Sequence, residues 1–92
     1  MILDGAKVIA ITKKDDFGVI RYSDDSLPPI PVKYLAICQY EKHNNFYVFL
    51  CDENYEVQQD NLCDTFEEAM ECVLRKNKNA VWEEESFLSN KP

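Results

Sequence analysis

The side chains that could do chemistry in this chain are one histidine, four cysteines and several adjacent carboxylates. A nucleophilic enzyme needs a base beside its nucleophile, and the single histidine, His43, stands in a predicted hairpin loop, where we expect it to be solvated. Paired carboxylates can serve glycosidases or metal-dependent hydrolases, but only on the wall of a cleft. Three such pairs stand in predicted turns, where acids accept hydrogen bonds from local backbone amides: Asp15-Asp16, Asp24-Asp25 and Asp52-Glu53. The sequence therefore predicts a protein that is not an enzyme.

No cofactor or metal site is predicted either. Glycines occur only at Gly5 and Gly18, so the chain lacks a glycine-rich loop that could hold a phosphate. The segment from Asp52 has acids at alternate positions but lacks the glycine and the terminal glutamate of a calcium loop. The four cysteines have no CxxC spacing, which argues against a zinc site; they are Cys38, Cys51, Cys63 and Cys72.

The expected compartment is the cytoplasm. Residues 1–5 lack the basic start and apolar stretch of a secretory signal. The longest apolar run, Val8 to Ile11, is far shorter than the roughly 20 residues that a membrane-spanning helix needs. In a reducing cytoplasm the cysteines are expected to be free thiols.

Charge is distributed unevenly along the chain. The net charge is −7, from 17 acids and 10 bases, and residues 1–46 carry six of each. Between Asp52 and Glu71 there are eight carboxylates and no lysine or arginine; we call these residues the acidic tract. Nucleic acids and anionic membranes require a cationic surface, so direct binding to either is not predicted. A solvated surface usually mixes both signs, so the tract favours a cationic protein partner over the alternative of a merely solvated face.

Hydrophobic patterning predicts one α+β domain over residues 1–85, followed by a flexible tail over 86–92. Thr65 followed by Glu68 forms a capping box for an amphipathic helix that ends near Asn77. Residues 23–31 are expected to form a loop because three of them are prolines. Strands are expected over residues 6–12, 17–22, 33–41, 46–51 and 55–59, and from Ala80. The sequence thus predicts an antiparallel sheet of about five to six strands with one amphipathic helix packed on a face.

The hairpin of residues 33–41 and 46–51 is apolar on both faces, so we expect it at the centre of the sheet. Two registers are compatible with the connecting loop. A two-residue turn places Cys38 opposite Cys51, and a four-residue loop places Cys38 opposite Phe49. The first register would allow a cross-strand disulfide, which the expected compartment disfavours.

Residues 33–84 resemble a group of small bacterial proteins. The shared features are the hairpin, the aromatic-rich return strand that ends in Cys51-Asp-Glu-Asn, and the Thr65-Phe-Glu-Glu-Ala helix start. These features are similar to those of immunity proteins of interbacterial toxin systems, either contact-dependent inhibition or polymorphic toxin systems. The resemblance implies a protein that neutralises a cognate toxin by binding it, without chemistry. It carries over no functional residues.

The expected binding site therefore rests on charge alone. An acidic surface can occupy the basic substrate groove of a nuclease toxin and accelerate association electrostatically. A phage-type nucleic-acid mimic, such as an anti-restriction or anti-CRISPR protein, and a non-catalytic adaptor module are the alternatives. The candidate partner-binding residues are Asp52, Glu53, Tyr55, Glu56, Asp60, Asp64, Glu83, Glu84 and Glu85.

Overall fold

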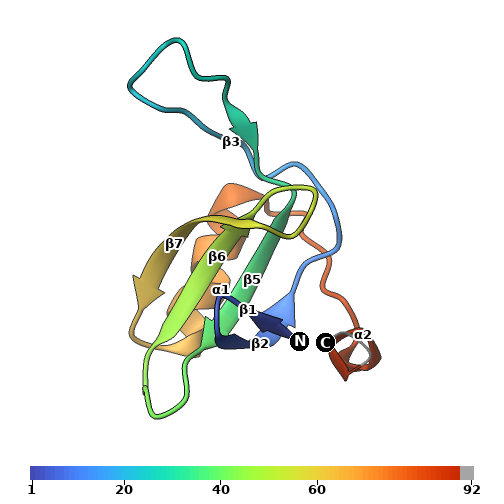
Figure 1. Ribbon diagram of the computed structural model, residues 1–92. Coiled ribbons are helices and arrows are strands. Elements are labelled where there is room, and N and C mark those ends of the chain that lie inside the picture. Colours follow the sequence, from blue (N-terminus) through green and yellow to red (C-terminus); the bar gives the residue numbers. More distant parts are fainter. Residues whose placement is uncertain (90–92) are drawn as a thin grey trace.

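A five-stranded antiparallel sheet forms the body of the protein, and helix α1 (Phe66–Lys76) covers one face (Figure 1). The computed structural model describes residues 1–89. The strand order is β1-β2-β5-β6-β7, with bounds Ile2–Leu3, Ala6–Ile11, Tyr34–Gln39, Phe46–Cys51 and Val57–Cys63. The predicted α+β class, with an antiparallel sheet and one amphipathic helix packed on a face, is confirmed.

Strands β5 and β6 lie inside the sheet and are buried on both faces, as the sequence predicts. On the face covered by α1, the helix-side core contains Leu35, Ile37, Val48, Leu50, Ala69 and Val73. On the opposite face, the aromatic-side core contains Tyr34, Ala36, Cys38, Phe49 and Cys51, with partly buried tyrosines packed against it. Each face of the hairpin therefore carries the side chains that the alternation of the sequence assigns to it.

Both predicted registers of this hairpin are wrong. Leu35 pairs with Leu50 and Ile37 with Val48, so residues 40–45 form a six-residue connection. Lys42 adopts a positive φ of 70°, and the His43 amide donates to the Tyr40 carbonyl at 3.1 Å. The observed register differs from the predicted ones by whole two-residue steps, so the side chains keep their faces.

The cross-strand disulfide does not form. Cys38 pairs with Tyr47 and Cys51 with Tyr34, which separates the two cysteines along the hairpin. All four cysteines are free and buried.

Helix α1 begins as the capping box predicts. The Thr65 hydroxyl accepts a hydrogen bond from the Glu68 amide at 3.1 Å, and the Glu68 carboxylate accepts one from the Asp64 amide at 3.0 Å. Ala69 and Val73 are buried against the sheet. The Asn77 amide donates to the Val73 carbonyl at 3.1 Å and ends the helix.

Several boundaries differ from the predicted ones. The strand expected at 55–59 is β7, which begins two residues later and extends to Cys63. The strand expected from Ala80 is a single bridge between Trp82 and Thr12. Residues 85–89 form a short helix, α2 (Glu85–Ser89), which overlaps the predicted flexible tail of 86–92, and Phe87 and Leu88 pack on the aromatic-side core. The remaining tail positions, 90–92, lie outside the described residues.

A projecting arm, residues 19–31, is a further departure from the prediction. Strand β3 (Val19–Ile20) pairs with β4 (Ile30–Pro31) in a separate two-stranded sheet, although the sequence places 30–31 in a loop. Proline is tolerated here because this small ribbon leaves edge positions that need no backbone donor. Residues 21–29 are exposed and extend away from the body (Figure 1).

The buried thiols predict a loss of stability at alkaline pH. Desolvation, with smaller contributions from neighbouring acidic groups, raises the pKa of Cys38 and of Cys51 to about 12. In the unfolded chain a thiol ionises near pH 8.5. Above that pH the unfolded chain releases protons that the folded chain retains, so this stabilisation is complete below about pH 8.5 and is lost as the pH rises towards 12.

We expect the melting temperature to fall by roughly 10 °C per pH unit above pH 9, because each thiol contributes about 1.4 kcal/mol per unit. Differential scanning calorimetry between pH 7 and 11 measures it. The variant Cys38→Ala/Cys51→Ala starts at a lower melting temperature but falls less steeply, with a residual slope from Cys63 and Tyr55, whose pKa values are also raised by burial. Equal slopes in the two proteins would contradict the assignment.

Candidate functional site

The turn between β6 and β7 holds four of the predicted site residues, and Asp52 organises it. One carboxylate oxygen, Oδ1, accepts hydrogen bonds from the amides of Asn54 at 2.9 Å and Glu56 at 3.0 Å. The other, Oδ2, accepts one from the side-chain amide of Gln58 at 3.0 Å. Asp52 is half-buried, whereas Glu53 and Glu56 are exposed. Asp52 therefore shapes the turn, and Glu53 and Glu56 are the carboxylates that it presents to solvent.

Tyr55 is held in the turn by a strained backbone and an aromatic contact. Its φ is +64°, a conformation uncommon for a residue with a side chain. Its ring stacks on Tyr34 with centroids 4.1 Å apart. Burial raises the pKa of the Tyr55 hydroxyl, and Tyr34 and the nearby carboxylate of Glu83 raise it further. The stacking fixes this turn against the aromatic-side core.

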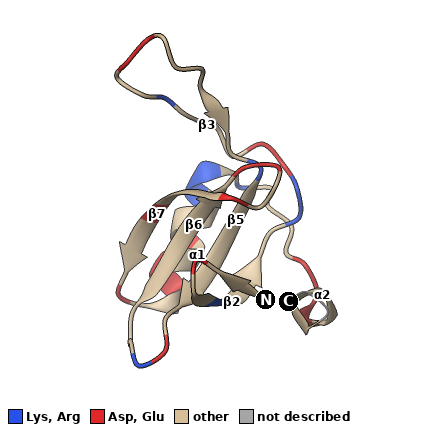
Figure 2. Cartoon of the chain, in the orientation of Figure 1, with Lys and Arg blue, Asp and Glu red and all other residues tan. Residues whose placement is uncertain are grey.

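The remaining acids of the tract follow β7 towards α1. Asp60 lies opposite Phe49, so its side chain is on the aromatic side of the sheet. Asp64 lies beyond the other end of β7 and is exposed, as are Glu67, Glu68 and Glu71 on α1. At a rise of about 3.3 Å per residue, Glu56 and Asp64 are roughly 26 Å apart. The tract is thus a line along one side of the molecule rather than one compact patch (Figure 2).

The three acids that follow Trp82 lie across the sheet from β7. The Glu83 amide donates to the carbonyl of Ile11 on β2 at 2.8 Å. Glu84 accepts a hydrogen bond from the Phe87 amide through its carbonyl, and Glu85 opens α2. Only Glu83 approaches the turn, through Tyr55. The structure therefore separates Glu84 and Glu85 from the tract.

Part of the aromatic side near β7 does not follow from the sequence. Tyr40 and Tyr47 contact each other edge to face, with centroids 5.3 Å apart, and the Tyr40 hydroxyl donates to the Asp4 carbonyl at 3.2 Å. Leu62, the neighbour of Tyr47 on β7, is 58% exposed. The period-two pattern assigns Tyr40 and Tyr47 to one face, but only the paired position of β7 shows that Leu62 and Asp60 share it.

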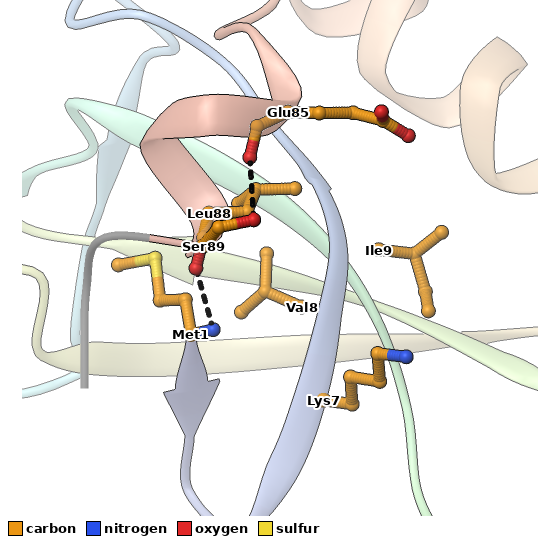
Figure 3. Close-up of a pocket in the computed structure, with 7 residues that line it drawn as sticks. All are labelled: Met1, Lys7, Val8, Ile9, Glu85, Leu88 and Ser89. Atoms are coloured by element: carbon orange, nitrogen blue, oxygen red, sulfur yellow. Dashed lines mark hydrogen bonds between the residues drawn. The ribbon is translucent and has the colours of Figure 1, made fainter.

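A hollow lies between β2 and α2. It has a volume of about 480 Å³ and is lined by Met1, Lys7, Val8, Ile9, Glu85, Leu88 and Ser89 (Figure 3). The ammonium group of Met1 donates to the carbonyl of Leu88 at 2.9 Å, which ties the first strand to α2. The charged side chains that line the hollow are those of Lys7 and Glu85.

Residues 1–89 contain neither a metal-binding cluster nor a membrane-spanning helix. No three histidine, cysteine or acidic side chains in this range are grouped so that they could hold a metal ion. None of the helices in the same range has the length and apolar character needed to cross a bilayer.

Comparison of the chain with protein-family models, with curated proteins and with solved structures gives no significant match.

The turn geometry predicts that Asp52 matters for stability and Glu53 does not. We expect Asp52→Ala to lower the free energy of unfolding by about 1–2 kcal/mol, because three hydrogen bonds are lost. Asp52→Asn keeps an oxygen acceptor for the two backbone amides and loses less. Glu53→Ala, an exposed neighbour, is expected to change stability by less than about 0.5 kcal/mol. Urea denaturation measures all three, and equal effects of the two alanine variants would contradict this role.

Proposed function

We propose that this protein is an immunity protein that binds and neutralises a cognate toxin, a basic nuclease, by covering its active site with an acidic surface. The observation that carries the proposal is the line of exposed carboxylates along the β6–β7 turn, β7 and the first turn of α1. No lysine or arginine interrupts it between Asp52 and Glu71. Like charges held together repel one another, and a cationic partner removes that repulsion.

The line has the dimensions of a protein-binding surface. Its exposed members Glu53, Glu56, Asp60 and Asp64 extend over more than 20 Å along β7 and the residues that flank it, by the rise per residue of about 3.3 Å. A nuclease binds the phosphate backbone with lysine and arginine, so the same side chains can pair with carboxylates presented along a line. Inhibition in this mechanism is stoichiometric and needs no catalytic residue.

The spacing of the carboxylates favours toxin immunity over nucleic-acid mimicry. Glu56, Asp60 and Asp64 recur every four residues, or about every 13 Å along the strand. Successive phosphates of one DNA strand advance by only about 3.4 Å along the helix axis. Widely spaced carboxylates suit separate ion pairs with a protein better than they imitate a continuous phosphate backbone.

Capture from the native host tests the function itself. The immobilised protein is exposed to a lysate of its own host, and bound proteins are eluted with a salt gradient. We expect a basic nuclease to elute at high salt and to lose its activity when one equivalent of the protein is added back. If every captured protein remains fully active in the presence of the added protein, the proposal is wrong.

Charge reversal tests the surface. We expect Glu53→Lys/Glu56→Lys to slow association with the captured nuclease about tenfold at low ionic strength, because electrostatic steering is lost. The difference should shrink as salt is added, and the melting temperature should stay nearly constant because both residues are exposed. The matched control Asp25→Lys/Glu41→Lys makes the same charge change outside the tract. Stopped-flow association rates that are equal for the two variants would place the interface elsewhere.

A further inference from the structure

Strand β7 is an open edge of the sheet. In the described part of the chain its one strand neighbour is β6. Proteins usually protect such edges with lysine, proline, a bulge or a very short strand. The opposite edge strand, β1, has two residues, whereas β7 has seven, with no lysine or proline among them. The register of the β6–β7 pairing shifts once, between the pair Leu50–Gln59 and the pair Cys51–Val57. This shift affects the first residues of β7 and leaves residues 59–63 regularly paired.

The hydrogen-bonding pattern shows which way the strands of the sheet direct their backbone groups. The Thr12 amide donates to the Leu35 carbonyl at 3.0 Å, so the backbone N–H and C=O groups of Leu35 point towards β2. In this sense a residue faces the strand at which these two backbone groups point. Successive residues of a strand face opposite neighbours, so Ala36 faces β6, where it pairs with Phe49. Phe49 therefore faces β5. The Cys51 carbonyl agrees, since it accepts a hydrogen bond from the Lys33 amide on the β5 side at 2.9 Å.

The same alternation identifies the free groups of β7. Val48 and Leu50 face β7 and pair with Asn61 and Gln59. Asp60 and Leu62 alternate with these two residues along β7. Their N–H and C=O groups therefore point away from β6, towards solvent. Their side chains share the aromatic side with Phe49 and Tyr47, their partners on β6.

The two sides of this edge differ in charge. On the aromatic side stands the carboxylate of Asp60, beside the exposed Leu62. On the α1 side a groove lies between β7 and α1 and is lined by Asn61, Leu62, Cys63, Cys72, Arg75 and Lys76. Glu68 also lies near Cys63 on this side. A strand added to this edge would meet Asp60 on the aromatic side and a mixture of two bases and one acid on the α1 side. Cations of such a strand are therefore better placed on the aromatic side.

We propose that β7 binds its protein partner by strand addition: an extended segment of the partner pairs antiparallel with Gln59–Cys63 and places lysine or arginine opposite Asp60. This proposal rests on the proposed function, since it takes the cationic partner from there, and adds how that partner is recognised. A second copy of this chain fits less well. Self-pairing would bring together two strands that each carry Asp60, on two molecules of charge −7 each.

A synthetic peptide tests strand addition without the natural partner. The probe is the acetylated, amidated peptide Thr-Lys-Thr-Arg-Thr-Lys-Thr, in which all cations share one side when extended. In antiparallel pairs with Asp60 and Leu62, the lysine and arginine residues direct their amides at β7. N-methylation of these three residues should weaken binding at least about tenfold. N-methylation of three alternate threonines, with equal charge, should leave binding nearly unchanged.

Amide hydrogen exchange followed by NMR locates the contact. We expect the unmodified peptide to slow exchange at Asp60 and Leu62, whose amides are free in the protein alone. Equal affinities for the two methylated peptides, or shift changes confined to Glu53 and Glu56, would mean that charge alone attracts the peptide, and would overturn the proposal.

Protein variants provide the complementary test. Leu62→Pro removes an amide that faces solvent, so it should fold with a native amide spectrum and lose peptide binding. Leu62→Ala keeps the amide and should retain binding; if Leu62→Pro does not fold, the methylated peptides decide the question. Asp60→Asn should bind more weakly, most clearly at low salt. Sedimentation that shows a dimer disrupted by Leu62→Pro would instead identify a second copy as the occupant.

The outcome for strand addition is separable from that for the proposed function. If a captured nuclease is inhibited equally by the wild-type protein and by folded Leu62→Pro, strand addition is wrong and the immunity function stands. If no nuclease is inhibited but the peptide binds through Asp60 and Leu62, strand addition stands and the immunity function is wrong.

Discussion

The burial of the β5–β6 hairpin on both of its faces is the constraint on which the rest of the structure depends. A single sheet divides the interior into a helix-side core and an aromatic-side core, and these two strands supply half of the buried side chains that fill the two cores. The helix-side core needs α1 as its cover. The aromatic-side core is covered by β1, α2 and the β6–β7 turn, through Leu3, Leu88 and Tyr55. The surface elements are therefore placed by what the central strands leave to be buried.

The sequence predicts this central arrangement well because alternation and capping are local signals. The faces of Leu35 and Ala36 follow from their positions in a period of two, and Thr65 with Glu68 predicts the start of α1. The register of the hairpin does not follow, because it depends on how many residues enter the connecting loop. Lys42 takes a positive φ there, and neither its residue type nor its neighbours indicate it. Helix α2 is missed for a similar reason, since five residues have little intrinsic helical stability and depend on packing.

The candidate site is only partly readable from the sequence. Charge counting finds the acidic tract but treats its members as equal. The structure distinguishes Asp52 from Glu53 and Glu56. Both carboxylate oxygens of Asp52 accept hydrogen bonds within the turn, whereas the side chains of Glu53 and Glu56 are exposed to solvent. The structure also separates Glu84 and Glu85 from the tract, because the chain crosses the sheet between Lys76 and Glu83. The exposure of Leu62 beside Asp60 depends on pairing with β6, which no local pattern encodes.

The projecting arm is fixed only at its base. Phe17 and Val32 are buried in the helix-side core, and the amide of each donates to a carbonyl across the base of the arm, at 3.0 Å to Val32 and at 2.9 Å to Gly18. Everything between β3 and β4 lies outside both cores. The length and composition of residues 21–29 can therefore diverge during evolution while the fold is conserved, which makes the arm the place where related chains can acquire different specificities at little structural risk.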